Sequence, residues 1–363
     1  MTERLSSTEV IDVLCRLGPR PALIDVRSEL EFAKAAVPGF VNLPILFQAE
    51  RHEVGIAYKH EGQKAAIDRG TELVLPDQGR RIELWRQEIA RAPVAEAIVT
   101  CWRGGLRSEI ACTWLRAAGQ QVYQVEGGYK GLRHVLLEVT SCPPPLVVIT
   151  GLTGSGKTQL LQSLGGGAID LEKAARHRGS AFGGWINHSQ PAQATFENTV
   201  GLEMIRQNRQ FDALMCEDES RMIGAVSLPD SFFAMMSKAP RVIIDEPLAV
   251  RTERIFRDYL EYPAHQGITA EQIRQKAVEA LDAVTRRLSS DAAMIRTIML
   301  EAFAKGLNYC DHEPWLAAIL TRYYDRGYHY AARHTKDLPV LFQGDLASCT
   351  DWCKDYVKNH RIS

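Results

Sequence analysis

The sequence predicts an α/β protein in which two domains, each with a mostly parallel sheet, are followed by a helical C-terminal region. Three observations support this prediction. At 363 residues, the chain is too long for one typical domain. Short apolar runs alternate with amphipathic stretches, which is typical of parallel strands joined by helices. A proline-rich break near residue 143 separates two such series.

The first domain is expected over residues 1–140. PALIDV at 21–26 is a short apolar run that carries Asp25 near its end, as a buried parallel strand does. A helix is expected over 28–39, where Pro38 and Gly39 end it. The other elements expected in this domain are strands over 41–45, 96–101 and 121–125 and a helix over 108–119.

The second domain is expected over residues 141–250. Cys142 is followed by three prolines, which favour a stiff extended connector rather than a helix. A buried strand over 146–150 then leads into a glycine-rich loop and a helix. Further strand-like runs, each leading into acidic residues, lie at 165–172, 211–220 and 241–247. Residues 251–363 are predicted to be a helical region that packs on this domain.

The composition limits the class of protein. The formal net charge is −1, which argues against a protein that coats nucleic acid but leaves room for a local basic groove. The eight cysteines show no paired CxxC spacing, so no residues are assigned as ligands of a protein-bound metal. The start of the chain lacks the pattern of a signal peptide, and no apolar run approaches the ~20 residues that span a bilayer. We therefore expect a cytoplasmic protein with free thiols, no membrane association and a monomeric state.

A reactive cysteine is predicted at the end of the strand over 96–101. CWRGGLRS at 101–108 has the spacing Cys-x5-Arg and stands between a strand and a helix. Backbone N–H groups of such a loop form a nest for anions, and the helix N-terminus adds positive potential, so the loop favours the nucleophilic thiolate. The predicted catalytic residues are Cys101, with Arg103 and Arg107 as donors to oxyanions. The competing interpretation is an inert core cysteine at the end of a strand.

Two chemistries use a loop of this kind. Protein tyrosine phosphatases carry a histidine before the cysteine, whereas residue 100 is threonine here and no acid loop with an aspartate is evident. LIDVR at 23–27, Glu31-Phe32 and PGFVNLP at 38–44 instead resemble the opening signature of rhodanese domains. The sequence departs from that signature at Ala35-Ala36, where Gly-His is usual. The loop is one residue longer than the commonest rhodanese form, which suits a tetrahedral, phosphate-bearing donor.

A phosphate-binding loop opens the second domain. GLTGSGKT at 151–158 matches G-x-x-x-x-G-K-[ST] and has the required strand before it and helix after it, so the domain resembles the P-loop NTPases. The backbone wraps phosphate oxygens, Lys157 supplies a positive charge and Thr158 can hold Mg²⁺. Asp170 with Glu172, and Glu217-Asp218-Glu219, are candidate metal-associated carboxylates, although each could equally be ordinary loop or helix-cap acidity. The predicted phosphate-binding set is Gly151, Gly154, Ser155, Gly156, Lys157, Thr158, Asp170, Glu217 and Asp218.

The chain as a whole resembles the bacterial tRNA 2-selenouridine synthases from Ile24 to about Tyr330. The order of a rhodanese module followed by this P-loop module is specific, because either module alone is common. The segments that carry the resemblance are CWRGGLRS, VEGGYKGLR at 125–133, the P-loop, AIDLEKAARHRGSAFGG at 168–184, QPAQATFEN at 190–198, EDESRMIG at 217–224 and YYDRGY at 323–328. No functional signal is apparent after residue 335.

This resemblance implies the chemistry. The substrate would be wobble 2-thiouridine in the tRNAs for lysine, glutamate and glutamine, and the sulfur would be replaced by selenium from selenophosphate. An S-geranyl-2-thiouridine intermediate would be made from geranyl diphosphate. Cys101 matches the cysteine of the family that is proposed to carry selenium as selanylcysteine. The resemblance implies no tightly bound cofactor: selenophosphate and geranyl diphosphate are co-substrates, and Mg²⁺ would accompany the diphosphate.

Several residues are candidates for contacts with the RNA and the prenyl chain. Arg251, Arg254 and Arg257 follow one another at i+3 steps, so on one helix they could line a phosphate track. Trp102 beside the nucleophile could stack on a flipped base. The remaining candidates are Arg176, His177, Arg178, Arg286 and Arg287 for RNA, and Phe182, Trp185 and Phe196 for a prenyl pocket. For each of them a solvated surface charge or a plain core aromatic is the simpler interpretation.

Two other functions remain open at this point. One is a rhodanese sulfurtransferase fused to an ATP-dependent small-molecule kinase. The other is a regulatory module in which the P-loop senses nucleotide and the rhodanese fold is inactive, but the intact Cys101 and Lys157 argue against it. A G-protein NKxD sequence is absent, which disfavours a GTPase switch.

Overall fold

The computed structural model describes residues 3–177, 189–288, 291–332 and 337–362. The chain divides into two compact units. Unit 1 comprises residues 1–140 and 192–206, and unit 2 comprises residues 141–191 and 207–363. The chain first passes from unit 1 to unit 2 between residues 140 and 141, shortly before the three prolines at 143–145. Residues 192–206, which we expected in the second domain, group with unit 1.

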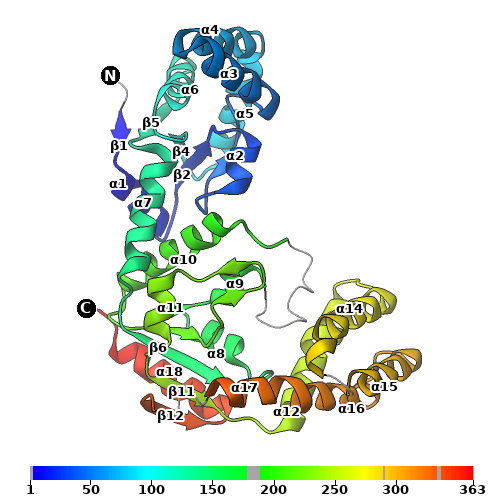
Figure 1. The fold of residues 1–363 in the computed structure, drawn as a ribbon. Helices are drawn as coiled ribbons and strands as arrows, with labels where there is room; N and C mark the ends of the chain where they lie inside the picture. Colours follow the sequence, from blue (N-terminus) through cyan, green and yellow to red (C-terminus); the bar gives the residue numbers. More distant parts are fainter. Residues whose placement is uncertain (1–2, 178–188, 289–290, 333–336, 363) are drawn as a thin grey trace. The chain divides into compact units, whose positions relative to one another are not determined.

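Unit 1 is built on a parallel five-stranded sheet with the order β1-β5-β4-β2-β3 (Figure 1). The predicted α/β class is therefore confirmed, and the predicted strand over 121–125 matches β5. The central strand β4 ends at Thr100, directly before the predicted nucleophile. The strands are β1 (Arg4–Leu5), β2 (Pro21–Asp25), β3 (Val41–Asn42), β4 (Val94–Thr100) and β5 (Gln121–Val125).

Helices cover both faces of this sheet, because alternate strand residues point to opposite sides. Val99 packs in the core that holds α5 and α6, whereas its neighbour Ile98 packs in the core that holds α1, α7 and α10. The helices of unit 1 are α1 (Ser7–Cys15), α2 (Glu29–Lys34), α3 (Gln48–Glu61), α4 (Gln63–Val74), the 3-10 turn η1 (Leu75–Asp77), α5 (Gln78–Arg91), α6 (Leu106–Ala117), α7 (Gly128–Ser141) and α10 (Gln193–Asn208).

The helices α3, α4 and α5 occupy a stretch to which the sequence analysis assigned no element. The helix α3 has 14 residues, and Ala57 is the one that the structure buries. A helix with so little buried surface carries no apolar stripe, and the stripe is the signal that reveals a helix in a sequence.

The helix α10 joins unit 1 through polar contacts and close packing. Asn198 is fully buried and donates a hydrogen bond to the carbonyl of Ala36 at 2.7 Å. The backbone N–H of Ala36 donates to Thr195 Oγ1 at 2.9 Å. Gly201 allows the close approach of α7, because a Cβ there would collide with the carbonyl oxygen of Leu136. The departure from the rhodanese signature at 35–36 is thus where α10 docks.

Unit 2 has its own parallel five-stranded sheet, in the order β12-β11-β6-β8-β7. Four of these strands lie in or next to predicted strand-like runs. The strands are β6 (Leu146–Gly151), β7 (Ala168–Ile169), β8 (Leu214–Glu217), β11 (Arg241–Ile244) and β12 (Val340–Gly344), and a separate hairpin consists of β9 (Met222–Ile223) and β10 (Val226–Ser227).

The region after residue 250 is mainly helical, as the predicted fold class states, but it also supplies the edge strand β12 (Figure 1). All five residues of β12 are exposed or half-buried, so it lacks the buried apolar run of a central strand. The helices of unit 2 are α8 (Lys157–Ser163), α9 (Leu171–Ala175), α11 (Asp230–Met236), α12 (Leu248–Phe256), α13 (Tyr262–His265), α14 (Ala270–Leu288), α15 (Asp291–Lys305), α16 (Tyr309–Ile319), α17 (Asp325–Ala332) and α18 (Leu346–Asn359), with π-helical turns η3 (Arg257–Glu261) and η4 (Leu320–Tyr324).

The helices α12 to α16 of unit 2 enclose an apolar core that includes Leu260, Ile295 and Trp315. None of the helices in the described ranges is long and apolar enough to cross a membrane.

Candidate active sites on the cysteine loop and the phosphate loop

Cys101 lies at the carboxyl end of β4, and its side chain is 3% exposed. Its Sγ is 3.1 Å from Ser108 Oγ, which belongs to the first turns of α6. Ser108 is fully buried, and its Oγ also accepts a hydrogen bond from Gln124 Nε2 at 2.9 Å. Ser108 Oγ also donates to the carbonyl of Gly105 at 3.0 Å, so a thiolate at Cys101 would compete with that carbonyl for the hydroxyl proton. Neither Ser108 nor Gln124 is among the predicted site residues; the available signal was the serine directly after the Cys-x5-Arg spacing.

The loop after Cys101 is held in place by the turn that follows β5. The N–H groups of Tyr129 and Lys130 donate to the carbonyls of Cys101 and Trp102 at 2.8 and 3.0 Å. Gln124 Nε2 donates to the carbonyl of Gly104 at 2.9 Å. Gly104 has a φ of +64°, and a Cβ there would collide with the carbonyl oxygen of Val125. The backbone of the loop is therefore fixed before any ligand binds, which is the arrangement that an anion nest requires.

The two predicted arginines of the loop have different environments. Arg107 binds Glu31 with both terminal nitrogens, at 2.6 and 3.0 Å. Burial alone would raise the pKa of Glu31, but the hydrogen bonds and charge of Arg107, helped by Ser28 and Arg51, lower it to about 2. Arg103 is exposed, and within the described ranges its guanidinium has no hydrogen bond or ion pair. Arg103 is thus the freer donor for an oxyanion, and Arg107 contributes its charge from a fixed position.

An aromatic pair borders the same loop. Trp102 is 39% exposed and stacks on the buried ring of Tyr129, with 5.4 Å between centroids. The guanidinium of Arg27 lies 4.0 Å from the Tyr129 centroid and is paired with Asp25 at 2.7 Å. Trp102 therefore offers an exposed, supported ring face beside the nucleophile, as base stacking requires.

Replacing Ser108 by alanine should slow the alkylation of Cys101 at neutral pH by about 10-fold. The reason is the loss of one hydrogen bond to a charged sulfur. The rate is measured with iodoacetamide by peptide mass spectrometry, because Cys142 and Cys310 are exposed and also react. Thr113→Ala on the same helix is the control, since Thr113 Oγ1 bonds to the carbonyl of Glu109 instead. Equal rates in wild type and the Ser108 variant would contradict this role.

The phosphate loop connects β6 to α8 in unit 2. Gly154 and Gly156 have φ values of +83° and +98°, which glycine adopts without strain. Lys157 Nζ donates to the carbonyl of Gly151 at 2.9 Å, so the side chain lies back over the loop. Ser155 is fully buried, and its Oγ has no hydrogen-bond partner among the described residues. The predicted loop residues are therefore brought together as the motif requires.

Carboxylates gather at the start of α8. Thr158 Oγ1 donates to Glu172 Oε2 at 2.8 Å, and the backbone N–H of Glu172 donates to Glu217 Oε1 at 2.7 Å. Burial raises the pKa of Glu217 well above its usual value, with Asp170 and Glu172 adding to the effect. Burial and the charge of Glu172 raise the pKa of Glu219 to about 8, against the opposing charge of Lys157. A cation bound here would favour the ionised form of these buried carboxylates.

The other predicted acids of this site have structural partners. Asp170 caps α9 by accepting from the N–H of Lys173 at 2.8 Å. Asp218 Oδ2 accepts from Thr150 Oγ1 and forms an ion pair with Arg241, both at 2.7 Å. No group of three or more His, Cys, Asp or Glu side chains in the described ranges is placed to hold a metal ion.

The expectation that Arg251, Arg254 and Arg257 form one exposed track is wrong. Arg251 is only 4% exposed, because both of its terminal nitrogens bind Asp325 at 2.9 Å. Arg254 Nη1 donates to the carbonyl of Gly154 at 2.6 Å, which places it at the phosphate loop. Arg257 is exposed and pairs with Glu253. Sequence spacing showed the shared helix but not the loop against which two of these arginines pack.

The other candidates lie apart from these sites or outside the described residues. Phe196 is fully buried on α10, which belongs to unit 1. It is therefore a core residue of unit 1 and not part of a prenyl pocket in unit 2. Arg286 and Arg287 are exposed in the last turn of α14. Arg176 is exposed and His177 is half-buried after α9. Arg178, Phe182 and Trp185 lie outside the described residues.

Comparisons with known proteins add to this geometry. Residues 144–360 match the family model described as tRNA 2-selenouridine synthase AAA domain, and residues 11–134 match the rhodanese-like domain. The chain is 41% identical to the tRNA 2-selenouridine synthase of Chromohalobacter salexigens over 92% of this chain and 94% of that protein. It is 39% identical to the protein of the same name from Cupriavidus necator, over 93% and 95% of the two chains. It is 37% identical to that of Marinobacter nauticus, over 92% and 94%.

Proposed function

Because this chain belongs to the tRNA 2-selenouridine synthase family, we propose that it replaces the sulfur of wobble 2-thiouridine by selenium in the tRNAs for lysine, glutamate and glutamine. The observation that carries the proposal is that this one chain keeps both a fixed cysteine loop and a complete phosphate loop. Selenophosphate is the selenium donor, and geranyl diphosphate is the second co-substrate.

The phosphate loop takes the diphosphate of geranyl diphosphate. A diphosphate suits the loop amides, the charge of Lys157 and the guanidinium of Arg254, which touches the carbonyl of Gly154. The thiocarbonyl sulfur attacks the first carbon of the geranyl chain, the carbon–oxygen bond breaks and diphosphate leaves. The uracil ring then loses its N3 proton, which gives neutral S-geranyl-2-thiouridine. Alkylation makes the sulfur a better leaving group for the second step.

The cysteine loop handles selenium. Selenophosphate is a tetrahedral anion of the size that a nest and a helix N-terminus bind, and Arg103 can add donors to its oxygens. Cys101 carries the selenium, and the hydrogen bond between its Sγ and Ser108 Oγ stabilises the charged form. In the loading step the Cys101 thiolate bonds to selenium, the Se–P bond breaks and phosphite leaves with its electron pair. The selenium of the resulting Cys101–S–Se⁻ group adds at C2 of the alkylated base and geranylthiolate leaves. A small-molecule thiol then cleaves the S–Se bond, which releases 2-selenouridine and leaves a disulfide on Cys101 that a second thiol reduces. The exposed face of Trp102 stacks on the base.

Mg²⁺ fits the phosphate loop as a companion of the diphosphate. Mg²⁺ binds through one or two carboxylates together with substrate phosphates and keeps several waters. Thr158 and Glu172 supply such a donor set, and burial together with the neighbouring charges of Glu172 and Asp218 raises the pKa of Glu219 to about 8. When bound, the ion neutralises charge on the diphosphate. The roles of Lys157 and Arg254 in holding the phosphates are the same with or without it.

The test is mass spectrometry of nucleosides from 2-thiouridine tRNA after incubation with both co-substrates. Wild-type protein should produce 2-selenouridine with both co-substrates and S-geranyl-2-thiouridine with geranyl diphosphate alone. A tRNA transcript that lacks the 2-thio group should give neither product. Rapid ATP turnover without tRNA, together with the absence of both nucleosides, would favour the alternative, a sulfurtransferase fused to a kinase.

A further inference from the structure

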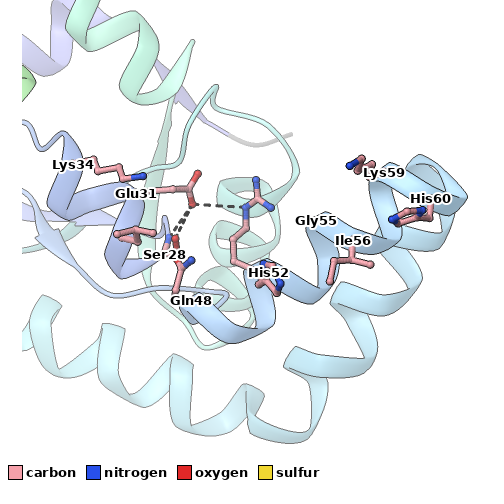
Figure 2. A pocket seen from close by; sticks show the side chains of 11 residues that line it. Ser28, Glu31, Lys34, Gln48, His52, Gly55, Ile56, Lys59 and His60 are labelled. Atoms are coloured by element: carbon pink, nitrogen blue, oxygen red, sulfur yellow. Dashed lines mark hydrogen bonds and ion pairs between the residues drawn. The ribbon is translucent and has the colours of Figure 1, made fainter.

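Unit 1 contains a pocket of about 500 Å³ between α2 and α3 (Figure 2). Five of its eleven lining residues carry basic or imidazole side chains: Lys34, Arg51, His52, Lys59 and His60. Apart from Lys34, these residues come from α3. Neither the cysteine chemistry nor the phosphate loop uses this pocket.

The residues of α3 form one face of the helix. Arg51, Gly55 and Lys59 are spaced four apart, and so are His52, Ile56 and His60, so the two rows lie side by side. With a rise of 1.5 Å per residue, the distance along the helix from Arg51 to His60 is about 14 Å. The positive charges are therefore spread along a line, and Lys34 faces it from α2.

Gly55 stands in the middle of this face. Its φ lies outside the left-handed region, so the backbone does not require glycine there, and glycine inside a helix costs about 1 kcal/mol relative to alanine. A Cβ at position 55 would lie 3.1 Å from Arg51 Nη1. The missing side chain leaves the centre of the face open and lets the Arg51 guanidinium lie over it.

The charge of the pocket is positive. Glu31 is the one carboxylate among the lining residues, and both of its oxygens already bind Arg107. Glu31 Oε2 also accepts from the N–H and hydroxyl of Ser28, and Arg51 Nε is 3.9 Å from it. Lys34 and Lys59 are exposed, and within the described ranges their ammonium groups have no hydrogen bond or ion pair. These two charges are available for a ligand.

Glu31 also connects the pocket with the cysteine loop. The carboxylate forms a wall of the pocket and at the same time holds Arg107, the last residue of the Cys-x5-Arg loop. A ligand in the pocket therefore lies against the same ion pair that borders the nucleophile.

We propose that this pocket binds consecutive backbone phosphates of the substrate RNA and so positions the tRNA at the cysteine loop. The proposal rests on the proposed function, which makes tRNA the substrate. A single small phosphate would contact only one end of a face about 14 Å long, whereas an RNA strand places a charge at each end. Leu30 and Ile56, which are 46% and 48% exposed, offer apolar contact to the ribose and base between the phosphates.

The test measures the affinity for 2-thiouridine tRNA by fluorescence anisotropy over a range of salt concentrations. The double variant Lys34→Glu/Lys59→Glu should raise the Kd roughly 30-fold and reduce the slope of log K against log salt by about 1.4, the value for two phosphate contacts to a single strand. The control is Lys238→Glu/Lys358→Glu, with the same change of net charge at exposed lysines of unit 2. It should change the Kd by no more than about 3-fold.

A second variant tests the shape of the pocket without changing its charge. Gly55→Gln fills the centre of the face, and it favours the helix, so the protein should fold. It should weaken tRNA binding by roughly 5-fold or more while the salt slope stays nearly unchanged.

The outcomes separate this proposal from the proposed function. If wild-type protein makes 2-selenouridine but the lysine double variant binds tRNA like wild type, the pocket is not the RNA site and the function stands. If the double variant binds tRNA like wild type but loses the binding of inorganic phosphate that wild type shows, the pocket takes small anions instead of RNA. If wild-type protein neither binds nor modifies 2-thiouridine tRNA, both proposals fail together.

Discussion

Replacing Cys101 by alanine should lower the yield of 2-selenouridine by at least about 1000-fold, because the variant lacks the nucleophile of the selenium step. S-geranyl-2-thiouridine should still form and should accumulate, since geranylation is assigned to the phosphate loop of the other unit. The measurement is mass spectrometry of tRNA nucleosides with both co-substrates present.

The matched control is Cys112→Ala on the helix that follows the loop. Cys112 is fully buried, and its burial raises the pKa of its thiol to about 12, so it is an unreactive core residue. This variant should keep most of the selenium incorporation. If Cys101→Ala removed geranylation as well while its thermal unfolding matched wild type, the assignment of the two steps to two loops would be wrong.

Replacing Lys157 by alanine should weaken the binding of geranyl diphosphate by about 10- to 100-fold, which corresponds to the loss of one hydrogen-bonded charge on the diphosphate. The same change removes the positive charge that opposes the crowded carboxylates, so the pKa of Glu219 should rise further above about 8. Binding is measured by titration calorimetry in the presence of Mg²⁺.

Lys173→Ala is the control for this variant. Lys173 is an exposed lysine of α9, and its backbone N–H donates to Asp170 Oδ1, a bond that does not involve the side chain. This control should bind geranyl diphosphate as wild type does. Unchanged affinity in the Lys157 variant would mean that the phosphate loop serves another ligand.

The two loops could be predicted because each is defined by consecutive residues. Residues 96–119 and 146–164 each contain a strand, a glycine-rich turn and the start of a helix in direct succession. Both series are present in the structure. The same holds for the α/β class, since alternating short apolar runs and helices leave few arrangements other than parallel sheets. Local patterns failed at α3 and β12, which bury too little to show a period.

The supporting contacts could not be predicted, because they join residues far apart in the sequence. Arg251 and Arg254 were expected to contact RNA. In the structure Arg251 pairs with Asp325, and Arg254 bonds to the carbonyl of Gly154 in the phosphate loop. The grouping of 192–206 with unit 1 depends on Asn198, Thr195 and Gly201 meeting partners that precede them by more than 60 residues.

The sequence by itself determined the nucleophile, the phosphate loop, the fold class and the resemblance to a family, because each depends on the types and order of neighbouring residues. Only the tertiary structure decided which groups surround them. It placed Ser108 at the sulfur of Cys101 and Gln124 against Ser108, paired Arg107 with Glu31 and formed a basic pocket that Glu31 also lines. The physical reason is that hydrogen bonds, burial and charge act through space, and the chain brings these partners together only when the sheet and its helices have formed.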